Sequence, residues 1–495
     1  MTESGTSADM ISDIVMMDAA DISVAITSRR VSCVEVMTAY LDHIEVFNPK
    51  VNAIVALRER EDLLAQARVR DDQLTRGEVV GPLHGFPLAV KDLQWVAGIP
   101  STSGSPILRD FAPTQDSLPV ERMRAAGAIF IGKTNTPEFG LGSHTYNPVY
   151  GATRGAYDQA RSAGGSSGGA AVALALRMAP LADGSDYGGS LRNPAGWNNV
   201  LGFRPGFGVV PTAGEDAWLP SMGVTGPMAR TVADLALLLS VLAGQDPRAP
   251  LSLAGDGRRF LQPLEANLAG KRIGWLGDIG GWAPYEVGVL ELCGEALKAF
   301  RDVGCIVDEA IPDHAPEPVW EAFKTLRHWQ VGANLAMFHA DPDSRGLLKP
   351  EAIWEVEKGM RLTAFDVTAA STVRTAWSNS FRRLFKDYDY LLMPTAQVFA
   401  FDVNQHWPRE IAGRAMATYH EWMKAVCLVS MSGCPSLAVP AGFSAAGLPM
   451  GLQIIAPVGG ELDCLKLAHA HEAATRWVAR RLPPLLTGGG HGAPL

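Results

Sequence analysis

The sequence predicts an α/β fold built on a largely parallel or mixed sheet with helices on both faces. Helix and strand alternate twice, with an apolar strand at 86–90 before a helix at about 118–126 and a strand at 128–131, and again over 271–310. Hydrophobic residues make up 47% and charged residues 19% of the 495 positions, which is typical of a well-filled globular core. This length is compatible with one large domain or with two to three smaller ones.

Charge and cysteine content limit the class of partner. The formal net charge of −9 argues against binding to nucleic acid or to an anionic membrane, because both need clustered Lys and Arg. The six cysteines are scattered, with no CxxC pair and no metal-ligand spacing, so we expect reduced thiols. Met1–Asp9 lacks the basic and apolar pattern of a signal peptide, and the small-apolar run 170–180 contains Arg177 and is too short to cross a bilayer. A cytoplasmic protein is the expectation.

The first 70 or so residues predict helices. Ser32 and Glu35 form a capping-box pattern, and apolar residues then recur at helical spacing from Val34 to Ile44. The strand that follows at 86–90 ends in Lys91, which places an ammonium group at the carboxyl end of a strand. Ligand sites of open α/β sheets gather at that edge.

The remaining elements are predicted in chain order. A small-residue helix at 170–178 precedes a strand at 181–186. The stretch 245–270 is looser, and a helix at about 286–303 lies between strands at 271–275 and 305–310. We expect mostly helix over 317–388, and a helix with Met416, Tyr419, Met423 and Val426 on one face. Further strands are expected at 390–393, 437–440 and 450–455, and a disordered Gly-rich tail at 487–495.

Two glycine-dense segments carry serines. The first is Gly164-Gly165-Ser166-Ser167-Gly168-Gly169, and the second runs from Gly184 to Arg192 and contains Gly188-Gly189-Ser190. Glycine lets the main chain approach a ligand closely and aim several N–H groups at one point. An oxyanion site is built in this way, so these serines are candidates for nucleophilic chemistry that needs a base.

Two familiar motifs fit by letter but not by context. Residues 127–134 match the P-loop pattern, yet the four intervening residues are Ala, Ile, Phe and Ile, and the order is helix, cap, strand. Residues 164–168 match the nucleophile elbow, but no buried strand precedes them. The late histidines His469 and His471, which a Ser/His/Asp enzyme would need, lie in an alanine-rich helical stretch. A base other than histidine is therefore required.

Taken together, these residues resemble the amidase signature family of serine hydrolases. Lys91, the Ser166-Ser167 doublet and Ser190 within Asp-x-Gly-Gly-Ser-x-Arg occur in the order of that family. The resemblance covers most of the chain, strongly from about 80 to 212 and thinly from 245 to 390. Other matching segments are 132–138, 201–205, 433–435 and 447–453.

The resemblance implies an α/β/α sandwich with a large twisted mixed sheet and a Ser-Ser-Lys triad. Ser190 matches the nucleophile, Ser166 the bridging serine after a cis peptide bond, and Lys91 the general base. The N–H groups of Tyr187, Gly188, Gly189 and Ser190 would hold the oxyanion, with Tyr187 bulkier than is usual in the family. Gly140-Leu141-Gly142 matches a segment that lines the acyl pocket, although it is equally compatible with a plain turn. The resemblance also implies a helical segment at 1–70 packed on a catalytic domain at 71–486.

Physical chemistry sets conditions on these roles. A lysine base must have its pKa lowered from ~10.4 by about 3 units to work at neutral pH, which burial and hydroxyl neighbours would achieve. Asp92 is adjacent to Lys91 on an extended segment, so its side chain should point to the opposite face. We expect Asp186 and Arg192 to form a structural ion pair or hydrogen-bond network, and Ser167 to serve as a loop hydroxyl that satisfies backbone groups.

The sequence therefore predicts an amidohydrolase that cleaves C–N acyl bonds of small amides through an acyl-enzyme, with carbamates (urethanes) as further substrates. No metal or organic cofactor is expected, and the partners are small molecules, with no nucleic acid and no membrane, in a monomer or homodimer. Two alternatives stay open: a component of an amidotransferase with glutaminase activity in a heteromeric complex, and a binding protein that retains an inactive site.

Overall fold

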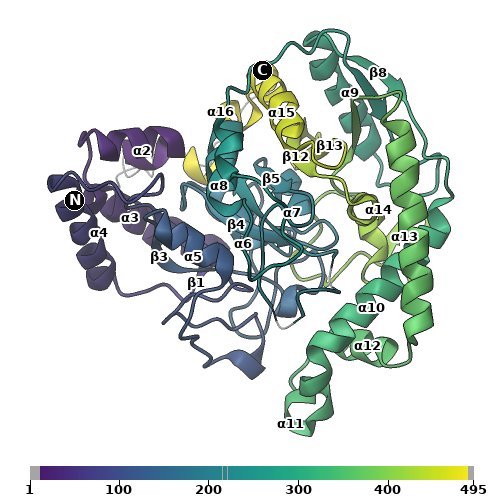
Figure 1. Cartoon of the computed structure of the whole chain (residues 1–495), viewed down its shortest axis with the longest axis horizontal. Helices are drawn as coiled ribbons and strands as arrows, with labels where there is room; N and C mark the ends of the chain where they lie inside the picture. The colour runs from purple at the N-terminus through teal and green to yellow at the C-terminus, as the bar shows by residue number, and fades with distance from the viewer. Residues whose placement is uncertain (1–11, 215, 220, 489–495) are drawn as a thin grey trace.

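The computed structural model describes residues 12–214, 216–219 and 221–488, and an eight-stranded mixed sheet forms its centre (Figure 1). The strand order is β4–β6–β5–β12–β13–β9–β7–β8. Pairing is antiparallel from β4 to β9 and parallel between β9, β7 and β8. The strands are β4 Ala182–Asp186, β5 Leu201–Arg204, β6 Val224–Ala229, β7 Arg272–Trp275, β8 Ile306–Glu309, β9 Tyr390–Pro394, β12 Ser436–Phe443 and β13 Pro449–Ile455.

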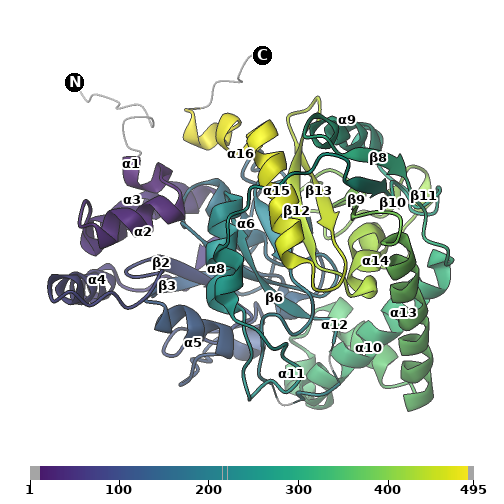
Figure 2. The same cartoon turned by 45° about the horizontal axis from the view of Figure 1, so that its top comes forward.

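Helices cover both faces of this sheet (Figures 1 and 2). One layer contains α8, α15 and α9, which pack side by side, and the other contains α6, α7 and α14. This arrangement is the expected α/β/α sandwich with a large mixed sheet. The helices are α6 Gly168–Ala175, α7 Arg192–Trp197, α8 Val232–Leu242, α9 Val289–Asp302, α14 Lys424–Ser432 and α15 Glu461–Thr475, with the short α16 Trp477–Arg480 after α15.

A small sheet carries Lys91 to the edge of the large one. Its order is β1–β3–β2, with β2 parallel to β3 and β1 antiparallel to it. β2 also packs against β4, and the backbone N–H of Lys91 donates a hydrogen bond to Asp183 of β4 at 2.9 Å. The last residue of β2 is thus fixed beside the strand that leads into Ser190. The strands are β1 Ile54–Val55, β2 Pro87–Lys91 and β3 Ile129–Thr134.

Two helical regions flank the sheets. In the N-terminal region the predicted capping box starts α3, where Ser32 and Glu35 satisfy each other's backbone N–H groups. The second region packs α10 against α12, α13 and α14, at one side of the molecule in Figure 2. The helices are α1 Asp13–Met16, α2 Ala19–Thr27, α3 Cys33–Val51, α4 Arg60–Thr75, α5 Leu118–Ala125, α10 Pro316–Ala340, α11 Pro342–Arg345, α12 Pro350–Gly359 and α13 Ala364–Leu384.

Most predicted elements are confirmed, and one is wrong in part. Met416 and Tyr419 precede α14 instead of lying on it: Met416 follows a hairpin of β10 Glu410–Ile411 and β11 Arg414–Ala415, and a 3₁₀ turn at Glu421–Met423 starts the helix. Both side chains are buried all the same, so their apolar spacing reflects burial of a loop and not a helical face.

Several further expectations can be compared with the structure. Residues 127–134 run from the turn after α5 into β3, with Gly127 at positive φ, which is the helix–cap–strand order that argues against a P-loop. All six cysteines are free and buried. The predicted tail falls largely on 489–495, outside the described residues. Within the described chain, no helix combines the length and apolar character needed to cross a membrane.

Candidate active site

Lys91 ends β2 with its side chain fully enclosed among hydroxyl groups. Its Nζ lies 2.7 Å from Ser166 Oγ, 2.9 Å from Ser167 Oγ and 3.0 Å from Ser185 Oγ. The Ser185 carbonyl oxygen accepts a fourth, longer contact at 3.3 Å. Burial lowers the pKa of Lys91 to about 7, although the charges of Asp183 and Asp186 act in the opposite direction. A large fraction of this amine is therefore neutral near pH 7, as a base requires.

Three carboxylates lie near Lys91, and each is engaged by a group other than the Lys91 ammonium. Asp92 accepts from the backbone N–H of Thr102 at 3.1 Å and from its hydroxyl at 2.6 Å, and it faces Lys133 at 3.8 Å. This confirms that the Asp92 side chain points away from Lys91. Asp183 accepts the Lys91 backbone N–H, and its other oxygen has no hydrogen-bond partner among the described residues.

Asp186, the third carboxylate, organises the turn that carries Ser190. It pairs with Arg192 at 3.1 Å and with Arg204 at 3.2 Å, all three side chains being buried. Although burial opposes it, these two arginines hold the pKa of Asp186 well below its usual range. Asp186 also accepts the backbone N–H of Gly189 at 2.8 Å and that of Leu191 at 3.1 Å. The expected Asp186–Arg192 ion pair is confirmed, and it shapes the loop in front of α7.

Ser166 and Ser167 precede α6, and the peptide bond between Gly165 and Ser166 is cis. The Ser167 hydroxyl donates to the Ser185 carbonyl at 3.5 Å, as expected of a loop hydroxyl that satisfies a backbone group, and its Oγ also accepts from Lys91 Nζ at 2.9 Å. Its backbone N–H donates to the Ser190 carbonyl at 3.2 Å. No buried strand leads into this segment, only isolated bridges such as that between Arg154 and Ser162. The geometry of a nucleophile elbow is therefore absent from the described residues here.

The backbone around Ser190 has N–H groups available for a ligand. Among the described residues, the N–H groups of Tyr187, Gly188 and Ser190 have no hydrogen-bond acceptor, whereas that of Gly189 is taken by Asp186. A side chain at Gly189, where φ is +108°, would lie 2.3 Å from Val426 of α14. Glycine at this position therefore lets the turn pack directly against the helix.

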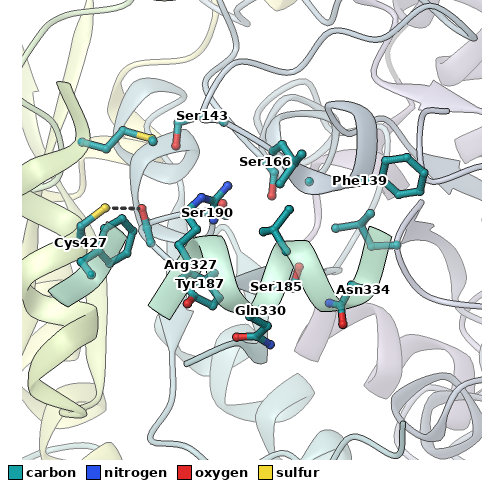
Figure 3. Close-up of a pocket in the computed structure, with 18 residues that line it drawn as sticks. Phe139, Ser143, Ser166, Ser185, Tyr187, Ser190, Arg327, Gln330, Asn334 and Cys427 are labelled. Atoms are coloured by element: carbon teal, nitrogen blue, oxygen red, sulfur yellow. Dashed lines mark hydrogen bonds between the residues drawn. The ribbon is translucent and has the colours of Figure 1, made fainter. Parts of the chain in front are cut away.

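Ser166 and Ser190 line one pocket of about 160 Å³ (Figure 3). Gly140, Leu141 and Gly142 also line it, so the segment predicted to border the acyl pocket is at the cavity wall. In the described part of the chain, the hydroxyls of Ser166 and Ser190 are not hydrogen-bonded to each other. The structure thus joins Lys91 to Ser166 and leaves the link from Ser166 to Ser190 open. The other lining residues are Leu93, Phe139, Ser143, Ser185, Tyr187, Gly188, Phe323, Arg327, Gln330, Val331, Asn334, Met423 and Cys427.

Glycine at position 140 is favoured by its backbone conformation. Its φ is +69°, and a Cβ there would lie 2.8 Å from Leu93 Cδ1 and 3.7 Å from Ser166 Oγ. Packing is also close at Gly188, since a Cβ would lie 3.0 Å from the Cys427 sulfur and 3.2 Å from Phe323. The Cys427 thiol instead donates to the Gly188 carbonyl at 3.6 Å, which Figure 3 shows as a dashed line.

The helical region contributes residues that the sequence did not single out. Arg327 of α10 lines the pocket, and its guanidinium lies 5.4 Å from the Tyr187 ring centre. Tyr187 itself is half-buried and packs edge-on against Phe323, and its enclosed hydroxyl has no hydrogen-bond partner among the described residues. His471 is buried in α15 and stacks on Phe300, and no histidine lines this pocket in the described chain.

Comparison with known proteins identifies the family. The family model described as Amidase matches residues 35–465. The chain is 33% identical over 470 residues to an acylamidase of Rhodococcus erythropolis, covering 94% of this chain and 97% of that one. It is also 33% identical to a component of the glutamyl-tRNA(Gln) amidotransferase of Streptomyces coelicolor, over 94% of this chain and 97% of the relative.

The chain belongs to the amidase signature family. A bacterial aryl acylamidase of that family superposes with a TM-score of 0.89 at 29% identity, covering 98% of this chain and 100% of the other. The peptide amidase of Stenotrophomonas maltophilia gives a TM-score of 0.77 at 28% identity, covering 94% of this chain and 98% of that one. These findings confirm the resemblance, the fold class and the general activity: the protein is an amidase, an enzyme that hydrolyses amide C–N bonds.

Proposed function

We propose that the protein hydrolyses small amides through a covalent acyl-enzyme, with Ser190 as nucleophile, Ser166 as proton bridge and Lys91 as base. The observation that carries the proposal is the contact of 2.7 Å between a fully enclosed Lys91 amine and the Ser166 hydroxyl. At pH 7 about half of an amine with a pKa near 7 is neutral and able to accept a proton, whereas an exposed lysine is almost entirely protonated.

The first half of the cycle forms the acyl-enzyme. Neutral Lys91 takes the Ser166 proton as Ser166 takes the Ser190 proton, and Ser190 Oγ attacks the substrate carbonyl carbon. This step requires the Ser166 and Ser190 hydroxyls to come within hydrogen-bond distance once substrate is bound. Catalytic hydrogen bonds are often long in the free enzyme and shorten in the substrate complex. The proton then returns through Ser166 to the leaving nitrogen, the C–N bond breaks and the amine departs.

The second half releases the acid. Water gives a proton to the same relay and attacks the Ser190 ester, and Ser190 regains its proton as the ester bond breaks. The free N–H groups of Tyr187, Gly188 and Ser190 are suited to hold the negative oxygen in both halves. Gly189 was expected to join them, but its N–H already donates to Asp186 at 2.8 Å, so its contribution would be to shape the turn.

The proposed substrates are small amides and aryl amides, with carbamates as a further class. The relatives named acylamidase and aryl acylamidase support this range, since both match almost the whole chain. Leu93, Phe139 and Leu141 offer an apolar wall of the pocket on which an aryl or alkyl group could rest. We propose a monomer or homodimer that acts without nucleic acid or membrane.

Labelling with a fluorophosphonate, together with hydrolysis of p-nitroanilides and aryl carbamates, tests the nucleophile. We expect wild-type protein and Ser371→Ala, a substitution on the exposed face of α13, to be labelled and active, and Ser190→Ala to be neither. Lys91→Met and Ser166→Ala should each lower kcat by orders of magnitude, with the double variant little worse than either. Labelling that persists in Ser190→Ala would reject the assignment.

A second candidate function comes from the relatives named as components of glutamyl-tRNA(Gln) amidotransferases, which are 33–35% identical to this chain. Such a role predicts release of ammonia from glutamine within a stable heteromeric complex. Purified protein that cleaves an anilide alone and leaves glutamine untouched would exclude this candidate, whereas the reverse result would favour it.

A further inference from the structure

One wall of the pocket is formed by a polar face of α10. Arg327, Gln330 and Asn334 are spaced by three and four residues, so they share one side of the helix, and all three line the pocket (Figure 3). Arg327 is the one charged side chain among the 18 described residues that line it. The other walls consist mainly of serines, glycines and apolar groups.

The Arg327 side chain is held in place from behind. Its Nε donates to Glu355 of α12 at 3.0 Å, and its Nη2 donates to the Tyr419 hydroxyl at 3.0 Å. The Tyr187 and Tyr419 rings lie 5.4 Å and 5.7 Å from the guanidinium carbon. These contacts fix the plane of the guanidinium before any ligand arrives.

One end of the guanidinium remains free. Nη1 has no acceptor among the described residues, and it is not one of the fully enclosed polar atoms. Since Arg327 lines the pocket, we infer that Nη1 faces that space. An arginine that served only to join α10 to α12 would not need this end in the cavity.

Glu355 offsets the charge of Arg327 without blocking it. The carboxylate is buried behind the guanidinium and also accepts from His420 at 2.8 Å and from Tyr419. Burial lowers the pKa of His420 to about 4, so that imidazole adds no charge near pH 7. A ligand in the pocket therefore meets the positive end of an ion pair whose negative end lies further away, and the Coulomb interaction favours an oxygen acceptor over a cation.

We propose that Arg327 determines specificity, donating from Nη1 to a carbonyl or carboxylate oxygen that the substrate carries outside its scissile amide. This inference rests on the proposed function, because it assumes that the amide is cleaved at Ser190 in the same pocket. Amides with such an oxygen are the preferred class, and amides with a cationic group at that place are disfavoured.

Two substrate series test the proposal, one for each side of the scissile bond. The acyl series is succinyl, methyl-succinyl, butyryl and β-alanyl p-nitroanilide. The leaving-group series is 4-acetamidobenzoate, its methyl ester, acetanilide and 4-(aminomethyl)acetanilide. In at least one series, we expect kcat/KM for the oxygen-bearing members to exceed that for the cationic member by about tenfold to a hundredfold, the range of one charge-assisted hydrogen bond.

Variants then assign that preference to Arg327. The double variant Arg327→Gln/Glu355→Gln removes both charges together. It should reduce the ratio of kcat/KM for the oxygen-bearing substrate to kcat/KM for the cationic substrate by about tenfold or more. Arg327→Lys keeps the positive charge but loses the planar guanidinium and its several N–H donors, so it should give an intermediate ratio. This variant provides an independent test if the double variant does not fold. Arg345→Gln/Glu357→Gln removes an exposed ion pair of 2.8 Å between α11 and α12 and should leave the ratio unchanged.

The outcomes separate this inference from the proposed function. One outcome would overturn the role of Arg327 alone: Ser190-dependent hydrolysis of butyryl p-nitroanilide or acetanilide, with no preference for the oxygen-bearing substrates in either series. The same ratio in wild type and in both Arg327 variants would also overturn it. Absence of any Ser190-dependent hydrolysis would instead refute the proposed function.

Discussion

The acid limb of the pH–activity profile tests the proposed role of Lys91 as base. With a pKa of about 7, the neutral fraction of this amine is ~1% at pH 5 and ~90% at pH 8. We therefore expect kcat/KM to rise about tenfold per pH unit below pH 6 and to level off above about pH 8. An exposed lysine would be only ~0.04% neutral at pH 7, so the burial of Lys91 accounts for a gain of about a thousandfold in active base.

The same pKa shift has a cost in stability. Lowering the pKa from 10.5 to about 7 corresponds to about 5 kcal/mol. Between these two values the unfolded chain holds a proton on Lys91 that the folded chain lacks, so the free energy of unfolding rises with pH across this window. Below pH 7 both states are protonated and the full cost is present. From pH 6 to pH 9, wild type should gain about 3 kcal/mol relative to Lys91→Met, measured by urea unfolding.

Controls distinguish Lys91 from other groups that titrate nearby. Burial also raises the pKa of Glu472, on α15, to about 7, but this residue does not line the pocket. Glu472→Gln should leave the midpoint of the activity profile in place, while Lys91→Met should keep only a small residual rate with no acid limb. A midpoint near pH 10, or a profile that is flat from pH 5 to pH 8, would refute the role of Lys91 as base.

Other substitutions test the surroundings of the site. Ser185→Asp would place a carboxylate where a hydroxyl now lies 3.0 Å from Lys91 Nζ, so the activity midpoint should move up by 1–3 pH units, as an adjacent opposite charge does; an unmoved midpoint would contradict the contact. Asp186→Asn leaves two buried arginines without their carboxylate and should lower the free energy of unfolding by about 3–5 kcal/mol in urea titrations, with little change counting against the ion pairs. Tyr187→Phe removes a buried hydroxyl that has no partner in the described chain, so stability should stay within about 1 kcal/mol of wild type or rise; a larger loss by calorimetry would reveal a bond to this oxygen.

The parts of the site that sequence could predict are those that local pattern specifies. Lys91 was placed at a strand end because an apolar run stops there, and the structure ends β2 at that residue. Because adjacent side chains of an extended segment point to opposite faces, the sequence predicts that Asp92 points away from Lys91, and the structure shows Asp92 bound to Thr102 instead. The glycine-dense segments made their serines candidates because few other backbones can approach a ligand so closely, and the family resemblance then singled out Ser166 and Ser190.

What the sequence missed depends on contacts between distant segments. Arg327 lies in a stretch that was predicted only as mostly helical, and nothing local distinguishes it from an exposed arginine. Its position in the pocket follows from the packing of α10 on α12 and α14, which brings Glu355 and Tyr419 to it from 28 and 92 residues away. Tyr419 was misplaced on a helix for a related reason, since tertiary burial of a loop produced apolar spacing of about the helical period.

The carboxylates near Lys91 show how the chain keeps a buried amine largely neutral, because none of them forms an ion pair with its Nζ. A carboxylate in contact with Nζ would raise its pKa and remove most of the neutral form. Asp92 is instead engaged by Thr102, Asp183 by the backbone N–H of Lys91, and Asp186 by two arginines. Within the described chain, Nζ therefore meets only hydroxyl and carbonyl oxygens, which can accept from an ammonium or, for the hydroxyls, donate to an amine. The proposed base thus depends on the partners of these aspartates as much as on its own burial.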